Sequence, residues 1–291
     1  MITVHDQRRA PHREAAKGRE FKFEMVKALV MTGFGLNCDL ETSYALEVAG
    51  AEVERVHLNS LISGEKSLAS YRIFVIGGGF SWGDDHGAGV IMAIRLKHRL
   101  QDQISAFVDT GGIVIGICNG FQVLVNLGLL PGFQWGEMKR EVALIANDCG
   151  GFRDQWVNLS VNPASHCVLS RDIRSVELPI RHGEGKFFAE PGVIEKLIGQ
   201  KQVFLRYAKP DGSPALGEFP FNPNGSVKDI AGICDLTGRV AGLMPHPEAF
   251  NHFTNHPDWT FLKEKYRRQG KPIPEEGEGI KFFRNAVRYF E

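Results

Sequence analysis

The residue of this sequence with the clearest capacity for chemistry is Cys118, which stands between Gly116 and Gly120 in the run G-I-C-N-G. The apolar residues 112–117 before it predict a buried strand, and residues 121–127 after it predict the start of a helix. A thiol between two glycines at a strand-to-helix junction is typical of a nucleophile elbow, whose sharp turn excludes bulky neighbours. The helix N-terminus favours the thiolate form, so we predict a nucleophile. Taken alone, the pattern fits a small buried cysteine equally well.

A nucleophilic thiol needs a base, and the best candidates stand in the run M-P-H-P-E. His246 and Glu248 are two residues apart, and Pro247 disfavours a helical conformation for the histidine, so both side chains are expected on one side of an extended segment. The predicted strand 240–243 would bring them to the sheet edge that carries Cys118. His246 would then take the thiol proton, and Glu248 would orient the imidazole. An isolated H-P-E tripeptide is more often a turn with an exposed histidine.

Three consecutive glycines, residues 77–79, follow the predicted strand 73–76. Glycines at the end of a buried strand let backbone N–H groups approach a ligand closely. We predict an oxyanion hole that takes one N–H group from this loop and another from Asn119. The alternative is a simple tight turn. A dinucleotide-binding loop is not supported, because the spacing differs from G-x-G-x-x-G.

The elements that must position these residues alternate between apolar runs and amphipathic stretches in the first half of the chain. This alternation predicts an α/β fold with a doubly wound, mostly parallel, flavodoxin-like sheet flanked by helices. Such sheets bind ligands at the carboxyl ends of their strands. Short strands between turn-rich loops in the second half predict additional antiparallel strands. The predicted strands are 27–31, 52–57, 73–76, 112–117, 142–146, 156–161, 175–178, 203–207, 230–234 and 240–243, and the predicted helices include 40–49, 90–108 and 121–127.

Residues 1–24 are predicted to be a flexible N-terminal extension, and residues 25–291 a single domain. Within it, residues 250–278 are expected to be an insert-like loop region, and residues 279–291 a C-terminal amphipathic helix. His252 and His256 have the spacing of metal ligands on a helix, but a proline follows and no third ligand is evident. We therefore expect surface histidines and no metal site.

Composition excludes several classes of protein. The 34 basic and 34 acidic residues balance, which gives no support for a nucleic-acid or membrane partner. No apolar stretch has the length needed to cross a bilayer, and no signal peptide is recognisable. The five cysteines are scattered and include no C-x-x-C pair, which indicates a reducing compartment. We expect a cytoplasmic protein.

Six motifs within residues 26–250 carry a family resemblance. They are G-L-N-C-D (35–39), G-G-F-S-W-G-D (78–84), G-I-C-N-G-F-Q (116–122), H-G-E-G-K (182–186), N-P-N-G-S (222–226) and G-L-M-P-H-P-E (242–248). With them the sequence resembles the glutaminase subunit of phosphoribosylformylglycinamidine synthase, a class I, triad-type glutamine amidotransferase. The cysteine elbow and H-P-E are shared by all triad amidotransferases. C-N-G-F-Q, H-G-E-G and N-P-N-G-S point to this one branch.

The resemblance implies the class I amidotransferase fold and a role for each matching residue. Cys118 would be the nucleophile of a triad with His246 and Glu248, and the backbone N–H groups of Gly79 and Asn119 would form the oxyanion hole. The substrate-binding residues would be Gln122, Gly78, Phe80, His182 and Gly183. From the residues alone, Gln122 is an ordinary first-turn helix residue, and His182 belongs to an exposed turn.

The activity that the resemblance implies is hydrolysis of L-glutamine to glutamate and ammonia through a γ-glutamyl thioester. The ammonia would pass to an ATP-dependent synthetase that converts formylglycinamide ribonucleotide to formylglycinamidine ribonucleotide in de novo purine biosynthesis. No G-x-x-x-x-G-K-[ST] motif is present, so no cofactor is expected in this chain. ATP and Mg²⁺ would belong to a separate synthetase subunit, and a small third subunit is compatible with the pattern. The alternatives are another triad amidotransferase, a cysteine hydrolase or peptidase, and a non-catalytic glutamine-binding or scaffold subunit.

Overall fold

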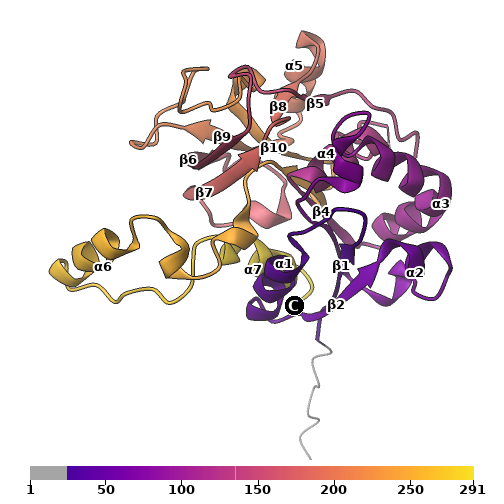
Figure 1. The fold of residues 1–291 in the computed structure, drawn as a ribbon, viewed down its shortest axis with the longest axis horizontal. Coiled ribbons are helices and arrows are strands. Elements are labelled where there is room, and N and C mark those ends of the chain that lie inside the picture. The colour runs from indigo at the N-terminus through magenta and orange to yellow at the C-terminus, as the bar shows by residue number, and fades with distance from the viewer. Residues whose placement is uncertain (1–24, 135) are drawn as a thin grey trace, which may run out of the picture.

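A nine-stranded sheet forms the centre of the protein in the computed structural model, which describes residues 25–134 and 136–291 (Figure 1). The strand order is β2-β1-β3-β4-β11-β10-β9-β6-β7. The first five strands in this order are parallel, and each later strand is antiparallel to its neighbour. The strands are β1 Lys27–Thr32, β2 Glu52–His57, β3 Ile73–Ile76, β4 Ile113–Ile117, β6 Arg153–Val161, β7 Ser175–His182, β9 Val203–Ala208, β10 Ile230–Cys234 and β11 Val240–Leu243.

Helices flank the sheet, which confirms the predicted fold class (Figure 1). The helices are α1 Asp39–Val48, α2 Leu58–Ile62, α3 Val90–Asp109, α4 Asn119–Leu127, α5 Pro191–Gly199, α6 Trp259–Arg268 and α7 Ile280–Arg288. Helices α1 and α7 pack against each other, as do α3 and α4. Because the central strands are covered, every residue of β3, β4 and β11 is buried. A separate two-stranded sheet joins β5 Ala143–Ile145 to β8 Lys186–Phe188.

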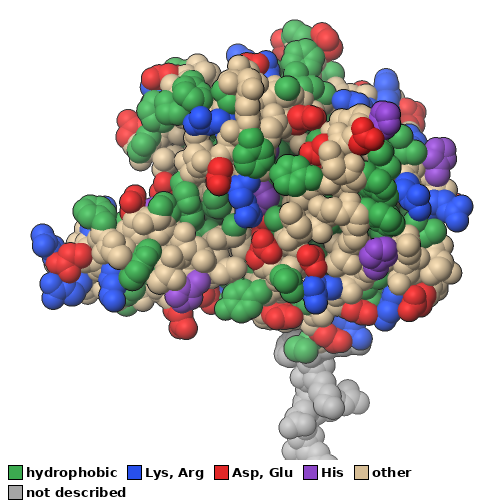
Figure 2. Space-filling model, in the orientation of Figure 1, with side chains coloured by type: hydrophobic (Ala, Val, Ile, Leu, Met, Phe, Trp, Pro, Cys, Tyr) green, Lys and Arg blue, Asp and Glu red, His purple; other side chains and the backbone are tan. Residues whose placement is uncertain are grey.

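The predicted extension 1–24 lies outside the described residues. The predicted terminal helix is present as α7, with Ile280, Phe283 and Val287 buried. None of the helices within residues 25–134 and 136–291 combines the length and apolar content that crossing a bilayer requires. Basic and acidic side chains are interspersed over the face in Figure 2, in keeping with the balanced composition.

The segment 250–278 differs from the loop that we predicted. It contains α6, and Figure 1 shows this helix extending away from the body of the protein. His252 and His256 flank a short 3₁₀ turn rather than lying on a helix. The expectation of two surface histidines is wrong for His256, which is buried with its Nε2 3.2 Å from Oε2 of Glu177 and its ring against Trp156.

Candidate active site

The backbone at Cys118 has the strained geometry of a nucleophile elbow. Cys118 directly follows β4 and precedes α4, and its φ and ψ are 50° and −104°, an unfavourable conformation for a residue with a side chain. A Cβ atom on Gly120 would lie 1.8 Å from the carbonyl oxygen of Ile76, and one on Gly116 would lie 2.7 Å from that of Gly120. Only glycine therefore fits on either side of the thiol, as the sequence pattern predicted.

The neighbouring strand supplies the candidate base. β11 pairs with β4 in parallel, and the N–H group of Cys118 donates to the carbonyl of Leu243 at 2.8 Å. Three residues beyond Leu243, the His246 Nδ1 lies 2.5 Å from Oε1 of Glu248, and both side chains are buried. His246 Nε2 has no hydrogen-bond partner among the described residues, so this nitrogen is available to the thiol. The structure thus brings together the three predicted triad residues.

The electrostatic surroundings favour a protonated His246. Burial alone would lower the pKa of the imidazole, but the Glu248 carboxylate, followed by the nearby Cys118 and Cys38 sulfur atoms, raises it well above the usual range. An imidazolium held between a carboxylate and a sulfur is the charge pattern of an activated thiol–imidazole pair.

The two predicted oxyanion donors lie at the same sheet edge. Gly79 is paired with Leu36 in an isolated bridge. The two hydrogen bonds of this bridge do not involve the Gly79 N–H group. Phe80 N–H donates to Gly35 O at 2.9 Å, and Asn37 N–H donates to Gly78 O at 3.1 Å. The bridge therefore leaves the Gly79 N–H group unused. The Asn119 N–H group opens α4, where the first N–H groups have no intrahelical acceptor.

Gln122 belongs to a buried polar cluster. Its Nε2 donates to the carbonyl of Glu184 at 2.6 Å, and its Oε1 accepts from Asn119 Nδ2 at 3.0 Å. Asn119 Nδ2 also contacts Oδ1 of Asp84 at 3.2 Å. Burial, followed by the negative charge of Glu184, raises the pKa of Asp84 to about 6. Gln122 is therefore one member of a connected cluster, and the simple reading of a first-turn helix residue is insufficient.

His182 is buried at the end of β7 and does not lie in an exposed turn. Its Nδ1 lies 3.1 Å from Asn147 Oδ1, and this oxygen also accepts from the Gly185 N–H group at 3.0 Å. Burial, followed by the positive charge of His246, lowers the pKa of His182 to about 3, so the ring is neutral. The amide oxygen can only accept, so Nδ1 carries the proton, and Nε2 is a lone pair without a partner among the described residues.

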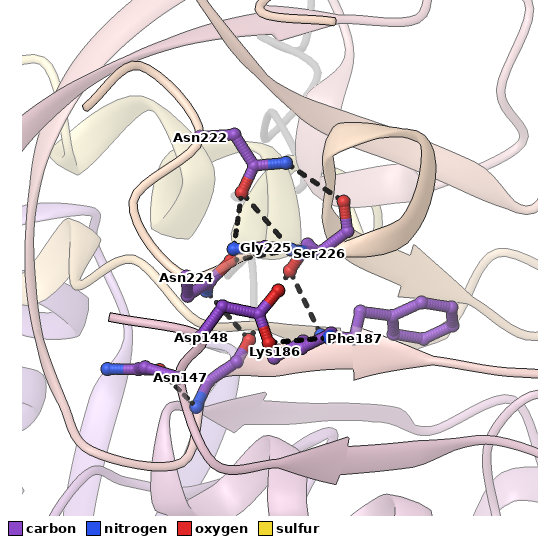
Figure 3. A network of polar contacts seen from close by, with 9 residues as sticks. Asn147, Asp148, Lys186, Phe187, Asn222, Asn224, Gly225 and Ser226 are labelled. Atoms are coloured by element: carbon purple, nitrogen blue, oxygen red, sulfur yellow. Dashed lines mark hydrogen bonds and ion pairs between the residues drawn. The ribbon is translucent and has the colours of Figure 1, made fainter. Parts of the chain in front are cut away.

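A network of asparagine side chains supports the H-G-E-G loop (Figure 3). Asn224 Nδ2 donates to Gly185 O at 2.8 Å and to the Tyr207 hydroxyl at 3.2 Å. Ser226 Oγ accepts from the Phe187 N–H group at 2.9 Å. The N-P-N-G-S motif, which the sequence could only associate with a family, therefore has a structural role in holding this loop.

The remaining predicted substrate residues occupy different positions. A Cβ atom on Gly78 would lie 2.7 Å from Cε1 of His246, so this glycine allows the imidazole to approach the loop. Gly183 is partly exposed, and its carbonyl accepts from Asn147 N–H at 2.9 Å. Phe80 is 44% exposed, with its ring 6.1 Å from that of Phe152, outside the buried cluster. Their contacts with glutamine stay a prediction.

The sequence reasoning missed two residues beside the triad, Cys38 and Arg181. Arg181 Nη2 lies 3.4 Å from His246 Nδ1, 3.9 Å from Glu248 Oε1 and 4.0 Å from Cys38 Sγ. The carbonyl of Arg181 accepts from Cys118 Sγ at 3.6 Å. Burial raises the pKa of the Cys38 thiol. Within the part of the chain that the structure describes, Cys38, His246 and Glu248 are also the group that could hold a metal ion, with ligand atoms within 4.8 Å of one another.

Comparison with known proteins identifies the family of the chain. The family of CobB/CobQ-like glutamine amidotransferase domains matches residues 25–290, so the chain is a glutamine amidotransferase by family. The chain is 45% identical to the phosphoribosylformylglycinamidine synthase subunit PurQ of Methanococcus maripaludis strain S2, over 91% of this chain and 97% of that protein. It is 43% identical to the PurQ subunit of Dehalococcoides mccartyi, again over 91% and 97%. The chain therefore belongs to the family of PurQ subunits of phosphoribosylformylglycinamidine synthase.

Solved structures give the same result. The structure of PurLQS from Thermotoga maritima matches with a TM-score of 0.67 and 27% identity, over 92% of this chain and all of that one. A glutamine amidotransferase from the same organism matches with a TM-score of 0.51 at 14% identity, which supports the fold alone. The resemblance inferred from the six motifs is confirmed.

Proposed function

We propose that this chain is the glutaminase subunit of a phosphoribosylformylglycinamidine synthase. It hydrolyses L-glutamine and delivers ammonia to a synthetase that converts formylglycinamide ribonucleotide to formylglycinamidine ribonucleotide. The observation that carries the proposal is the strained Cys118 elbow beside the buried His246–Glu248 pair, in a chain of the PurQ family.

In the proposed reaction, His246 Nε2 takes the proton of the Cys118 thiol. The thiolate attacks the side-chain amide carbon of glutamine, and a tetrahedral oxyanion forms. His246 then donates the proton to the leaving nitrogen, so that ammonia departs and a γ-glutamyl thioester remains. Water, activated by His246, hydrolyses the thioester to glutamate and regenerates the thiol. Glu248 holds the imidazole through Nδ1 and stabilises its positive charge.

The N–H groups of Gly79 and Asn119 are assigned to the oxyanion, because neither has a backbone partner among the described residues and both lie at the edge where Cys118 lies. Gln122, Gly78, Phe80, His182 and Gly183 are assigned to glutamine binding. The support for His182 is its buried Nε2 lone pair, which needs a donor such as an N–H group of the substrate.

The synthetase reaction is assigned to a separate subunit, and a small third subunit is compatible with the complex. ATP and Mg²⁺ are assigned to that partner, and no cofactor is assigned to this chain. The proposed location is the cytoplasm, and the support is a pattern of unpaired cysteines and the membership in a biosynthetic family.

Labelling with an electrophilic glutamine analogue tests the proposal. We expect one adduct by intact mass, mapped to Cys118 and prevented by excess glutamine. The Cys149→Ala variant is the matched control, because Cys149 is an exposed thiol that is not part of the triad and its loss should leave the adduct unchanged. An adduct on Cys38, or none in the presence of the synthetase subunit, would overturn the assignment.

A further inference from the structure

Three donor atoms of different chemistry converge around Nδ1 of His246, two of them from the triad itself. Cys38 Sγ, a nitrogen of His246 and a carboxylate oxygen of Glu248 lie within 4.8 Å of one another, and all three residues are buried. For atoms so spaced there is a point within about 2.8 Å of all three, and shifts of less than about 1 Å give Zn–S and Zn–N bonds of about 2.3 and 2.0 Å. Thiolate, imidazole and carboxylate together are a donor set that zinc prefers.

Two further features show that this space is built into the fold. A Cβ atom on Gly78 would lie 3.0 Å from Cys38 Sγ and 3.3 Å from His246 Nδ1, so the glycine keeps the approach to both donors open. Glu248 is fully buried, and its second oxygen, Oε2, has no hydrogen-bond partner among the described residues. His246 and Arg181 lie against Oε1 of this carboxylate, so Oε2 is the acceptor that a bound cation could use.

The cation that faces this space is a side chain. Arg181 Nη2 lies between 3.4 and 4.0 Å from a donor atom of each of the three residues. Its guanidinium balances the Glu248 charge while the Cys38 thiol is neutral. The Arg181 side chain is 36% exposed, so it can turn outward into solvent without unpacking the core.

We propose that Cys38, His246 and Glu248 form a latent binding site for a soft divalent cation such as Zn²⁺, and that Arg181 keeps metal out of it. Binding releases the Cys38 Sγ proton and the His246 Nδ1 proton to solvent, and the dication takes the place of the guanidinium charge. A metal bound there is coordinated by His246 Nδ1, the nitrogen that faces Glu248. The imidazole can then no longer cycle between its protonated and neutral forms. Arg181 is thus a positioning residue that protects the base.

The test uses Co²⁺ as a spectroscopic probe of the full-length chain, with Arg181→Gln as the variant that removes the cation. We expect a thiolate-to-cobalt absorption band in R181Q at concentrations at least about tenfold below those needed for the wild type. R181K retains a cation and should behave as the wild type does. R55Q is the matched control, because it removes another arginine that pairs with a carboxylate, Asp39, and it should also resemble the wild type.

Double variants identify the thiol that binds. The band should persist in R181Q with Cys118→Ser and disappear in R181Q with Cys38→Ser. If R181Q does not fold, as judged by circular dichroism, Arg181→Ala gives the same comparison. Equal cobalt affinity in wild type and R181Q, or a band that depends on Cys118 rather than Cys38, would overturn the proposal.

Inhibition of glutamine hydrolysis gives a second readout, and this arm alone rests on the proposed function. Zn²⁺ should inhibit R181Q at about tenfold lower concentration than the wild type, each measured against its own metal-free rate. A wild-type complex without glutaminase activity would count against the proposed function and leave the cobalt result standing. Equal zinc sensitivity of wild type and R181Q, in active complexes, would count against the metal site.

Discussion

The two halves of the sheet hold their functional residues by different physical means. In the parallel half, the Cys118 turn is fixed by steric exclusion, because Gly116 and Gly120 leave no room for a single methyl group. In the antiparallel half, the H-G-E-G loop is fixed by hydrogen bonds from buried amide side chains such as Asn147 and Asn224 (Figure 3). Steric positioning fails abruptly when one atom is added, whereas a network of hydrogen bonds loses strength in steps.

The largest effect is expected at Cys118, which follows β4 in the parallel half and whose Sγ contacts the carbonyl of Arg181 in the antiparallel half. Cys118→Ala removes the proposed nucleophile, and partner-stimulated glutamine hydrolysis should fall by about 10⁴-fold or more, measured as ammonia release. Peptide cleavage measured in parallel distinguishes a glutaminase from a peptidase. Retained ammonia release in this variant would refute the triad.

A smaller but still large effect is expected from a single methyl group in the parallel half. The Cβ atom of Gly120→Ala would meet the Ile76 carbonyl, so the free energy of unfolding should fall by about 3 kcal/mol in urea titration. Gly192→Ala is the matched control in the other half, because a Cβ atom there meets nothing within 4 Å and α5 gains a better helix former. Equal losses in the two variants would remove steric exclusion as the explanation.

The antiparallel half should respond in a graded way. Asn224→Ala leaves the Tyr207 hydroxyl without its donor, and the Gly185 carbonyl keeps only the long bond from Ser226 Oγ, so the free energy of unfolding should fall by about 2 kcal/mol. Asn59→Ala, at an exposed position, should change it by less than about 0.5 kcal/mol. Cooperative unfolding of the whole sheet in the Asn224 variant, with a loss as large as that of Gly120→Ala, would contradict the graded behaviour.

The smallest effect is a change in the acid dependence of stability. The pKa of His182 is about 3 in the folded protein, below its usual value near 6.5, so only the unfolded chain binds this proton as the pH falls between those values. Stability contributed by the neutral ring is therefore present above pH 6.5 and is lost on acidification. Between pH 7 and pH 5, the wild type should lose about 1–2 kcal/mol more than His182→Asn in urea titrations. Parallel pH curves for the two proteins would show that the ring is protonated when folded.

The sequence predicted best where local chemistry alone decides the structure. The strands 52–57, 73–76, 230–234 and 240–243 agree with the structure residue for residue, and the glycines around Cys118 predicted the elbow. The strand that begins at Ser175 was predicted to end at Leu178, before Pro179, but continues to His182. Proline is tolerated there because β7 is the edge strand of the sheet.

Other features could not be read from local patterns. Helix α6 has no buried residue, so its sequence contains no apolar stripe that would predict it. Cys38 and Arg181 are 143 residues apart, and their side chains meet only in the folded protein. Helix α5 does have a sequence signal, since Pro191 opens the helix and apolar residues follow at helical spacing.

The pairing of β4 with β11 has a consequence for how the protein folds. The strand before the thiol and the strand before the imidazole are side by side, with Gly116 opposite Gly242, yet about 125 residues separate them along the chain. Contacts of such long range form late, because the intervening chain must first be ordered. A partly folded chain with its first four strands in place would carry the thiol without its base. Catalytic activity is therefore a stricter measure of complete folding than secondary-structure content, because activity requires that β11 has paired with β4.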